Sequence, residues 1–295
     1  MAQTSKIINA LSIDVEDYFQ VSAFEAHINR DQWSQIDCRV ERNINEILAL
    51  LDEHDVKATF FTLGWIAERF PRLIKQISDQ GHEMASHGYD HVRVTKQSRN
   101  DFAQDIQHTK KLLEDICACP ITGYRAASYS INRTNLWAHE EILNAGHRYS
   151  SSVYPIHHDL YGIPDAPRFA FRPLPGTDLV EIPVTTLEIG SRRIPCGGGG
   201  FFRLYPYPVS RWMINRVNAK EHQSAIFYFH PWEIDAEQPR IPDLPWKTRF
   251  RHYLHLDQTK QRLGALLRDF SWAPMNQVYF GKQQSINDFP VFSLQ

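Results

Sequence analysis

The sequence predicts an α/β protein with a parallel β-sheet, followed by a mostly helical segment near its C-terminal end. Three observations indicate this fold class. Short apolar strands alternate with amphipathic stretches of helical length in the first half of the chain, glycines lie just past two of the expected helices, and polar clusters follow the strands. This alternation is typical of α/β folds, in which helices pack on the sheet.

Hydrophobic periodicity places the elements of the first half. Apolar residues from Ile44 to Leu51 recur at helical spacing, so one face of this helix is expected to be buried. Gly81 and Gly146 lie just past two further helical stretches, where a left-handed C-cap is expected. In chain order, we expect strands at residues 7–13, 58–63, 83–86 and 121–126, and helices at residues 40–51, 65–80, 102–116 and 134–144.

The second half is less regular because prolines interrupt it. Seven prolines between residues 155 and 195 mark loops and strand edges rather than helices. Four consecutive glycines at residues 197–200 lack the Gly-Lys-Ser/Thr ending of a phosphate loop and precede no clear helix, so a flexible loop beside a cleft is expected there. The elements expected here are strands at residues 179–189 and 225–229, and helices at residues 209–217 and 248–269.

The composition excludes several classes of protein. With 42% hydrophobic and 22% charged residues, the 295-residue chain has the composition of a soluble globular protein. Because the chain has 32 basic and 34 acidic residues, its net charge is too small to attract nucleic acid or anionic lipid electrostatically. The sequence has no 18-residue apolar run and no secretory signal, so a cytoplasmic location is expected. Its four irregularly spaced cysteines are expected to be buried or partly buried thiols.

Polar residues gather where predicted strands end. Residues 14–17 read Asp-Val-Glu-Asp after the first strand, residues 87–91 read His-Gly-Tyr-Asp-His after the third, and Arg125 and His230 end later strands. The carboxyl ends of parallel strands meet on one face of an α/β fold, where active sites are built. These clusters are therefore expected to form one site.

His87 and His91 are spaced so that both imidazoles can face one ion across a helical turn or a tight turn. Two histidines and a carboxylate, with one position open, form the ligand set of hydrolytic zinc enzymes. In a chain with 14 histidines, such a pair also arises by chance. Asp14 and Glu16 project to the same side of an extended strand, so one can bind metal while the other takes a proton from water.

The same clusters resemble the motifs of the NodB-homology polysaccharide deacetylases, carbohydrate esterase family four. The acidic motif is matched by residues 12–17, the His-x-x-x-His motif by residues 86–91, the arginine motif by residues 123–129 and the histidine-ended strand by residues 226–231. The resemblance covers about residues 7–235. It is closest to a branch associated with bacterial exopolysaccharide gene clusters, which shares the Asp-Val-Glu-Asp-Tyr-Phe and Phe-His-Pro-Trp-Glu segments.

The resemblance implies a distorted, incomplete (β/α) barrel of about seven strands with a C-terminal helical extension. We expect the deacetylase domain at residues 1–235 and the extension, packed on the barrel, at residues 236–295. The implied activity is metal-dependent hydrolysis of N-acetyl groups on N-acetylhexosamine units of a polysaccharide, in the biosynthesis of a bacterial exopolysaccharide. The partner is then an N-acetylated glycan, encountered in the cytoplasm or near the inner membrane, and the oligomeric state stays open.

Site residues are also implied by the resemblance. Asp14 is the expected base, His230 the expected acid, and Arg125 the partner of Asp14, with a bidentate contact expected between the two. The expected ligands of one divalent metal ion are Glu16, His87 and His91, with Asp17 as the alternative carboxylate. Zinc is the first candidate, and cobalt, nickel or manganese also suit such ligands. Tyr129, Trp232 and the aromatic residues between Phe201 and Tyr207 are candidates for binding sugar rings.

One departure from the family concerns the acid. The family's fourth motif supplies an aspartate and a tryptophan, whereas the corresponding residues 149–154 contain neither. Asp159 and Asp165 are the candidates to orient His230 in their place. Two other function classes stay open: an amidohydrolase acting on a small non-sugar amide, and a non-catalytic carbohydrate-binding relative.

Overall fold

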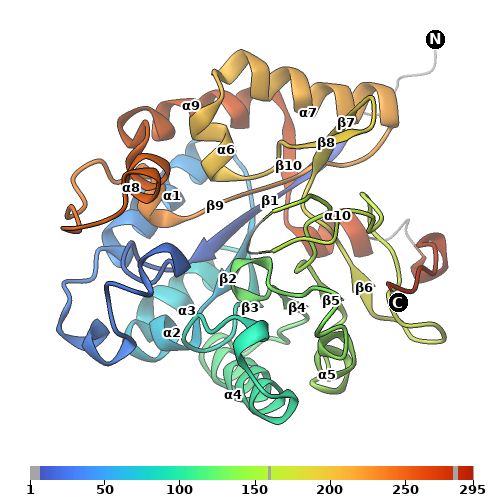
Figure 1. The fold of residues 1–295 in the computed structure, drawn as a ribbon, viewed down its shortest axis with the longest axis horizontal. Coiled ribbons are helices and arrows are strands. Elements are labelled where there is room, and N and C mark those ends of the chain that lie inside the picture. The colour runs from blue at the N-terminus through green and yellow to red at the C-terminus, as the bar shows by residue number, and fades with distance from the viewer. Residues whose placement is uncertain (1–6, 159–160, 282–284, 295) are drawn as a thin grey trace.

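The computed structural model describes residues 7–158, 161–281 and 285–294. Parallel strands form one curved eight-stranded sheet, and helices cover its outer side (Figure 1). The strands are β1 (Ile8–Val15), β2 (Thr59–Thr62), β3 (Glu83–Ser86), β4 (Gly123–Tyr124), β5 (Tyr149–Ser150), β6 (Val180–Glu181), β9 (Ile226–Phe229) and β10 (Ser271–Ala273). Seven of these, β1 to β6 and β9, lie within the region expected to form the incomplete barrel, and this fold class is confirmed.

Strand β1 lies at the centre of the sheet and pairs with three strands. Along one edge, β9 pairs with residues 10–13; along the other, β10 pairs with residues 8–10 and β2 with residues 12–15. All of these pairs are parallel, so the carboxyl ends of β1, β2 and β9 lie side by side. From β2 the sheet continues through β3, β4 and β5 to β6.

The barrel is open between β6 and β9. Within the described part of the chain no ladder joins these two strands, and the segment 184–198 lies between them. This segment includes a hairpin of β7 (Thr186–Ile189) and β8 (Arg192–Pro195). The backbone N–H of Tyr228 donates to the carbonyl of Gly197, and the N–H of Ile226 donates to the Thr185 hydroxyl. These hydrogen bonds join the segment to β9 where the barrel lacks a strand.

The helices pack their apolar faces on the sheet. Residues of β1 are buried from Asn9 to Val15, since helices cover one face and the barrel interior the other. The helices are α1 (Val40–Glu53), α2 (Gly64–Arg69), α3 (Pro71–Asp79), α4 (Arg99–Cys117), α5 (Ala138–Asn144), α6 (Gly199–Leu204), α7 (Tyr207–Glu221), α8 (Trp246–Tyr253), α9 (Leu256–Asp269) and α10 (Met275–Phe280). The four cysteines are free and buried or partly buried, as predicted.

Three predicted elements differ in the structure. The helix expected at residues 65–80 is two helices, α2 and α3, because Pro71 cannot continue the first and instead begins the second. The strand expected at residues 179–189 is divided into β6 and β7, with Pro183 between them. The loop expected at residues 197–200 is wrong, since Gly199 is the first residue of α6.

The C-terminal segment is helical, as expected, and also adds a strand. Helices α8, α9 and α10 follow residue 245, and the three-residue strand β10 lies against β1, as Figure 1 shows. Helix α10 is held by Glu83 at the start of β3, whose carboxylate accepts the backbone N–H of Asn276 at 3.0 Å. None of the helices among the described residues has the length and apolar character needed to cross a membrane.

Candidate metal-dependent hydrolytic site

Side chains from neighbouring strand ends meet in one cavity. Asp14 lies near the end of β1, Glu16 follows that strand, His87 follows β3, and His230 follows β9. All four line a cavity of about 230 Å³, together with His91, Tyr129 and Trp232. The convergence of strand ends predicted from the sequence is therefore present in the structure.

Glu16, His87 and His91 form a buried cluster that could hold a metal ion. One potential ligand atom from each residue lies within 4.8 Å of the others. His87 Nδ1 lies 2.8 Å from the carbonyl oxygen of Arg125, a contact that places the proton on Nδ1 and leaves Nε2 free as a ligand. His91 Nε2 lies 3.0 Å from Glu16 Oε2.

A tight turn, rather than a helix, brings the two histidines together. Gly88 and His91 both have positive φ angles, 75° and 57°, and the ring centroids of His87 and His91 lie 5.3 Å apart. The turn is held from outside, because the carbonyl of Gly88 accepts the N–H of Gly64 and the Asp105 carboxylate accepts the N–H of Tyr89. The backbone therefore fixes the histidine pair without help from a ligand.

The unsatisfied atoms of this cluster fit a cation. Although Glu16 Oε2 lies 3.0 Å from His91 Nε2, it makes no hydrogen bond among the described residues, and neither does buried His91 Nδ1. Buried polar atoms without a hydrogen bond cost free energy unless another group, such as a cation, compensates. Burial lowers the pKa of both His87 and His91, which keeps them neutral, as metal ligands must be. Burial also raises the pKa of Glu16 to about 7, an effect that a bound cation would oppose.

Asp17, the alternative carboxylate, is used elsewhere. Its Oδ1 accepts the N–H of Tyr18 at 2.8 Å, and its Oδ2 accepts the N–H groups of Arg39 and Val40 at 2.6 and 2.8 Å. It thus binds unpaired backbone donors at the start of α1, where a negative charge is stabilised. The geometry therefore favours Glu16 over Asp17 as the metal carboxylate.

Asp14 is paired with Arg125 deep in the barrel. Arg125 is fully buried, and its Nη1 lies 2.5 Å from Asp14 Oδ1. The expected bidentate contact is wrong, since Nε and Nη2 donate to the carbonyl and hydroxyl oxygens of Ser151. Asp14 Oδ2 is consequently left facing His230, whose Nε2 lies 3.9 Å away.

His230 has a carboxylate partner that the sequence analysis missed. Its Nδ1 lies 2.8 Å from Oε1 of Glu233, which is fully buried and paired through Oε2 with Arg203 Nε at 2.6 Å. Burial alone would lower the pKa of His230, but the charge of Glu16 and the hydrogen bond with Glu233 raise it to about 9. Burial raises the pKa of Glu233, but Arg203 and His230 outweigh this and lower it to about 2. His230 is therefore held as an imidazolium at neutral pH.

Of the two aspartates proposed as the support for His230, only Asp165 lies among the described residues, and it does not take this part. Asp165 is exposed and pairs with Arg133, and Asp159 lies outside the described residues. The segment Phe-His-Pro-Trp-Glu carried a usable signal. A proline after the histidine begins a short helical turn, and this turn brings Glu233 back beside His230. Glu233 and Trp232 thus supply, next to His230, a carboxylate and a tryptophan, neither of which is present in residues 149–154.

Two of the candidate sugar-binding residues, Trp232 and Tyr129, line the cavity but are mostly buried. Trp232 is 6% exposed and stacks between the rings of His230 and His252, with centroid distances of 5.2 and 4.2 Å. Tyr129 is 5% exposed, and its hydroxyl has no hydrogen-bond partner among the described residues. Both form walls of the site rather than open platforms.

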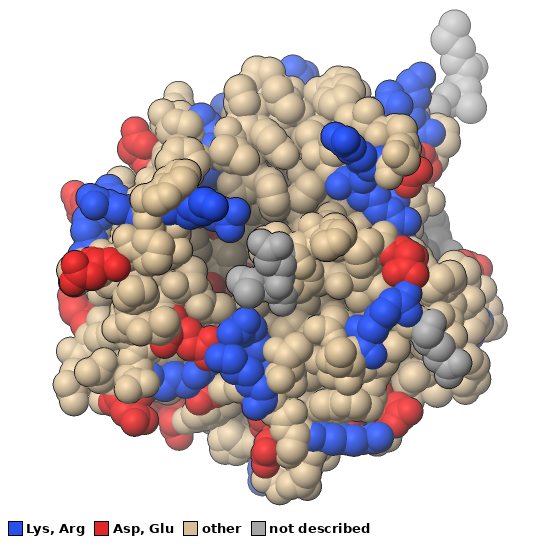
Figure 2. Space-filling model, in the orientation of Figure 1, with Lys and Arg blue, Asp and Glu red and all other residues tan. Residues whose placement is uncertain are grey.

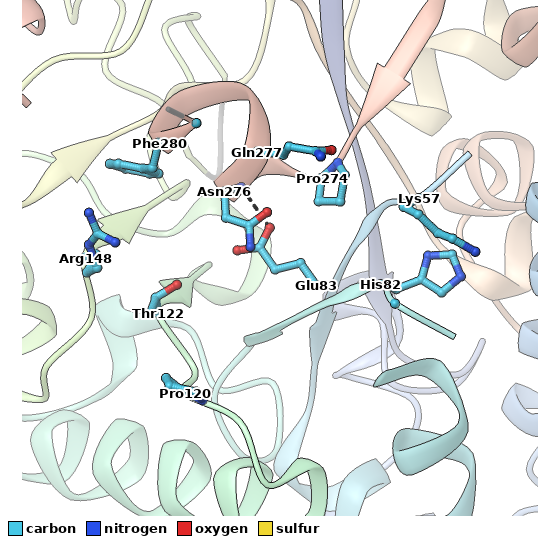
Figure 3. A pocket seen from close by; sticks show the side chains of 12 residues that line it. Lys57, His82, Glu83, Pro120, Thr122, Arg148, Pro274, Asn276, Gln277 and Phe280 are labelled. Atoms are coloured by element: carbon cyan, nitrogen blue, oxygen red, sulfur yellow. Dashed lines mark hydrogen bonds between the residues drawn. The ribbon is translucent and has the colours of Figure 1, made fainter. Parts of the chain in front are cut away.

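A larger cavity, of about 640 Å³, lies at the amino ends of the strands (Figure 3). Its central carboxylate, Glu83, is already satisfied, since it accepts hydrogen bonds from Thr59, Tyr149 and Asn276. None of the residues that line it belongs to the cluster of Glu16, His87 and His91. This cavity is therefore separate from the candidate site.

Comparison with known proteins shows which family part of this chain resembles. Residues 31–148 match the family model described as polysaccharide deacetylase. A peptidoglycan-N-acetylglucosamine deacetylase from Bacillus cereus is 40% identical over 68 residues, which are 23% of this chain and 25% of that protein. Over residues 31–148, which are 118 of its 295 residues, this chain is similar to the polysaccharide deacetylase family. Residues 151–280 match a second model, described as a domain of unknown function (DUF3473).

Other relatives of this family match similar lengths. A chitooligosaccharide deacetylase from Sinorhizobium fredii is 35% identical over 80 residues, 27% of this chain and 36% of the relative. A peptidoglycan deacetylase from Helicobacter pylori is 30% identical over 120 residues, 40% of this chain and 39% of the relative. The matched segments thus span less than half of the curated relatives' lengths.

Solved structures extend the likeness of fold to the whole chain. A protein from Mycobacterium smegmatis assigned as a polysaccharide deacetylase superposes with a TM-score of 0.64 at 16% identity, covering 100% of this chain and 96% of that one. Puue allantoinase superposes with a TM-score of 0.60 at 13% identity, covering 94% and 90%. At such identities these structures support the fold alone.

Proposed function

We propose that this protein is a metal-dependent deacetylase that hydrolyses N-acetyl groups on N-acetylhexosamine units of a polysaccharide. One observation carries the proposal: Asp14 and His230 flank the cluster of Glu16, His87 and His91 within a single buried cavity. Two of the matched relatives are named as deacetylases of peptidoglycan N-acetylglucosamine and of chitooligosaccharides. These names support an N-acetylated glycan as the substrate.

Glu16, His87 and His91 would hold the metal ion, and zinc is the first candidate. Two imidazole nitrogens and one carboxylate oxygen form the three-ligand set of catalytic zinc sites, although cobalt, nickel and manganese accept the same donors. When bound, the ion supplies Lewis acid catalysis, because it polarises the acetamide carbonyl and lowers the pKa of water.

Asp14 is the proposed general base. Its Oδ1 is held by Arg125, and its Oδ2 faces the cavity, where it can accept a proton from water as the water oxygen attacks the amide carbon. The buried guanidinium compensates the charge of Asp14 and fixes its orientation. Arg125 therefore acts by positioning the base.

His230 is the proposed general acid. Nδ1 is held by Glu233, so the proton on Nε2 is directed toward the cavity that also contains Asp14. When the carbon–nitrogen bond breaks, this proton passes to the leaving amine, and acetate forms from the acetyl group and water. Because the pKa of His230 is raised to about 9, this proton is present at neutral pH, as a general acid requires.

We also propose that the natural substrate is a bacterial exopolysaccharide. This narrower proposal rests on the resemblance of the Asp-Val-Glu-Asp-Tyr-Phe and Phe-His-Pro-Trp-Glu segments to the branch found with exopolysaccharide gene clusters. Assays with polymers of different linkage would identify the preferred glycan.

The test is acetate release by purified protein supplied with one equivalent of zinc. N-acetylglucosamine oligomers should release acetate, whereas small amides such as N-acetyl amino acids should not. Asp14→Asn should lower kcat roughly 10²–10⁴-fold while zinc binding, measured by elemental analysis, is retained. Release of acetate only from small amides would favour a non-sugar amidohydrolase. Glycan binding without any acetate release would contradict an enzymatic function.

A further inference from the structure

An apolar groove lies beside the catalytic cavity, between α6 and α8. We call it the α8 groove; its walls include Tyr161, Phe201, Leu204, Trp246, Phe250 and Arg251. Its volume, about 570 Å³, lies within the range of small-molecule binding pockets. Most of its walls come from α8 and α6, and neither Trp246 nor Phe250 belongs to the proposed catalytic machinery.

Two aromatic residues of this groove, Trp246 and Phe250, are exposed rather than packed. Trp246 is 73% exposed and Phe250 is 51% exposed, and Leu204 across the groove is 47% exposed. Trp246 and Phe250 are four residues apart in α8, so their side chains share one face of the helix. Large apolar side chains gathered on a surface in this way indicate a binding site.

Tyr161 connects the groove to the catalytic cavity. It lines both spaces, and its ring stacks on that of buried Tyr154, with centroids 5.9 Å apart and planes inclined by 8°. A chain-like ligand with one unit at His230 can therefore continue past Tyr161 toward Trp246. Figure 2 shows a hollow near the middle of this face of the molecule, with Lys and Arg side chains around it.

The groove combines aromatic rings with cationic donors. Lys247 Nζ lies 5.9 Å from the centre of the Trp246 ring, and Arg251 lines the same wall. The faces of sugar rings carry C–H groups that are attracted to the negative face of an aromatic ring, whereas sugar hydroxyl and acetyl oxygens accept hydrogen bonds from Lys and Arg. A purely apolar chain would accept no hydrogen bonds from these cations.

We propose that the α8 groove binds the sugar units that adjoin the one undergoing deacetylation, with Trp246 and Phe250 as stacking platforms. The proposal rests on the function proposed above and defines its substrate class more narrowly, as a glycan chain of several units rather than a single sugar. It also gives the C-terminal segment a role in substrate selection.

The test compares β-1,4-linked N-acetylglucosamine oligomers of one to six units as substrates. In the wild-type protein, kcat/KM should rise with chain length. The double variant Trp246→Ala, Phe250→Ala should lose this rise through a KM for the hexamer roughly tenfold higher, while its activity on the shortest active oligomer is unchanged. Trp212→Ala is the matched control, because Trp212 is 48% exposed on α7 and lines a different cavity. It should behave as wild type.

Binding is measured in parallel, so that failure of the groove and failure of the enzyme can be told apart. In isothermal titration calorimetry the hexamer should bind wild-type protein and Trp212→Ala equally, and the double variant roughly tenfold more weakly. Hexamer binding that needs Trp246 and Phe250 without acetate release would support the groove and contradict the deacetylase function. Activity independent of chain length, an unchanged KM in the double variant, or binding of polyprenyl-phosphate vesicles but not the hexamer would overturn the groove.

Discussion

The contact between His230 and Glu233 is the feature at residue scale that most alters the interpretation of the sequence. Without a carboxylate beside His230, the absent fourth motif left a non-catalytic relative as an open alternative. Glu233 supplies that carboxylate from three residues away, and Arg203 balances its charge. A buried, charge-balanced pair of this kind can orient an imidazolium and stabilise it.

We predict that Glu233→Gln lowers kcat roughly 10–10²-fold with little change in KM, since a neutral amide no longer stabilises the imidazolium of His230. Zinc content should stay at the wild-type value because Glu233 is not among the proposed ligands. Steady-state kinetics and elemental analysis provide the measurements. Glu237→Gln, at an exposed position paired with Arg42, is the control and should resemble wild type. An unchanged kcat in Glu233→Gln would refute a role for this carboxylate in positioning His230.

At the scale of elements, the glycine run at the start of α6 is shaped by the same carboxylate. A methyl group on Gly199 would overlap both carboxylate oxygens of Glu233, whereas one on Gly200 would meet nothing within 4 Å. Because Glu233 is fixed by Arg203 and His230, it cannot move aside cheaply. Gly199 therefore reflects close packing of α6 on the Glu233 carboxylate rather than a flexible loop.

Gly199→Ala is accordingly expected to destabilise the protein by about 1–3 kcal/mol, the usual cost of overpacking, and to lower kcat by displacing Glu233. Gly200→Ala should keep or slightly raise stability, because alanine favours a helix over glycine. Urea unfolding of both variants measures the difference. Equal stabilities for the two alanine variants would show that Glu233 adapts without cost.

The sequence predicted the elements whose signals are local. β1 to β4 and α1 follow from hydrophobic periodicity within a single segment, and the strand before His230 is a compact apolar run. β10 could not be found in this way, because a three-residue strand has no period and its partner β1 lies at the other end of the chain. Glu233 was missed for a related reason: its role depends on Arg203, a residue from a different helix.

The site was predicted to the same extent. Asp14, His87, Arg125 and His230 lie at strand ends, and parallel topology alone brings strand ends together. Alternation along the strand favours Glu16 over Asp17 from the sequence alone, but spacing could not show that Asp17 is used at the start of α1. The Asp17 carboxylate accepts hydrogen bonds from three backbone N–H groups, two of them at the start of α1. Glu16 is therefore the carboxylate that lies beside the histidines.

For the whole molecule, buried neutral histidines make stability depend on pH. His147 is 2% exposed, neither ring nitrogen has a hydrogen-bond partner among the described residues, and burial lowers its pKa to about 3. The unfolded chain, with an ordinary histidine pKa, binds more protons than the folded one below about pH 6.5. The contribution of neutral His147 to the free energy of unfolding is therefore fully present above pH 6.5 and is lost as the pH falls from 6.5 toward 3.

His147→Phe should remove this part of the acid sensitivity. Relative to pH 8, wild-type protein at pH 5 should lose about 2 kcal/mol more unfolding free energy than the variant. Urea denaturation of both metal-free proteins at the two pH values measures the difference, and other titrating groups cancel in the comparison. The same loss in both proteins would mean that His147 is protonated in the folded state.

The central claim is that Glu16, His87 and His91 hold one metal ion that deacetylation requires. Its most direct test is a titration of chelator-treated protein with zinc while acetate release from the N-acetylglucosamine hexamer is measured. We predict no release without metal, a linear increase up to one equivalent, and no further increase beyond it. Full acetate release from the metal-free protein, or none after one equivalent of zinc has bound, would contradict the claim.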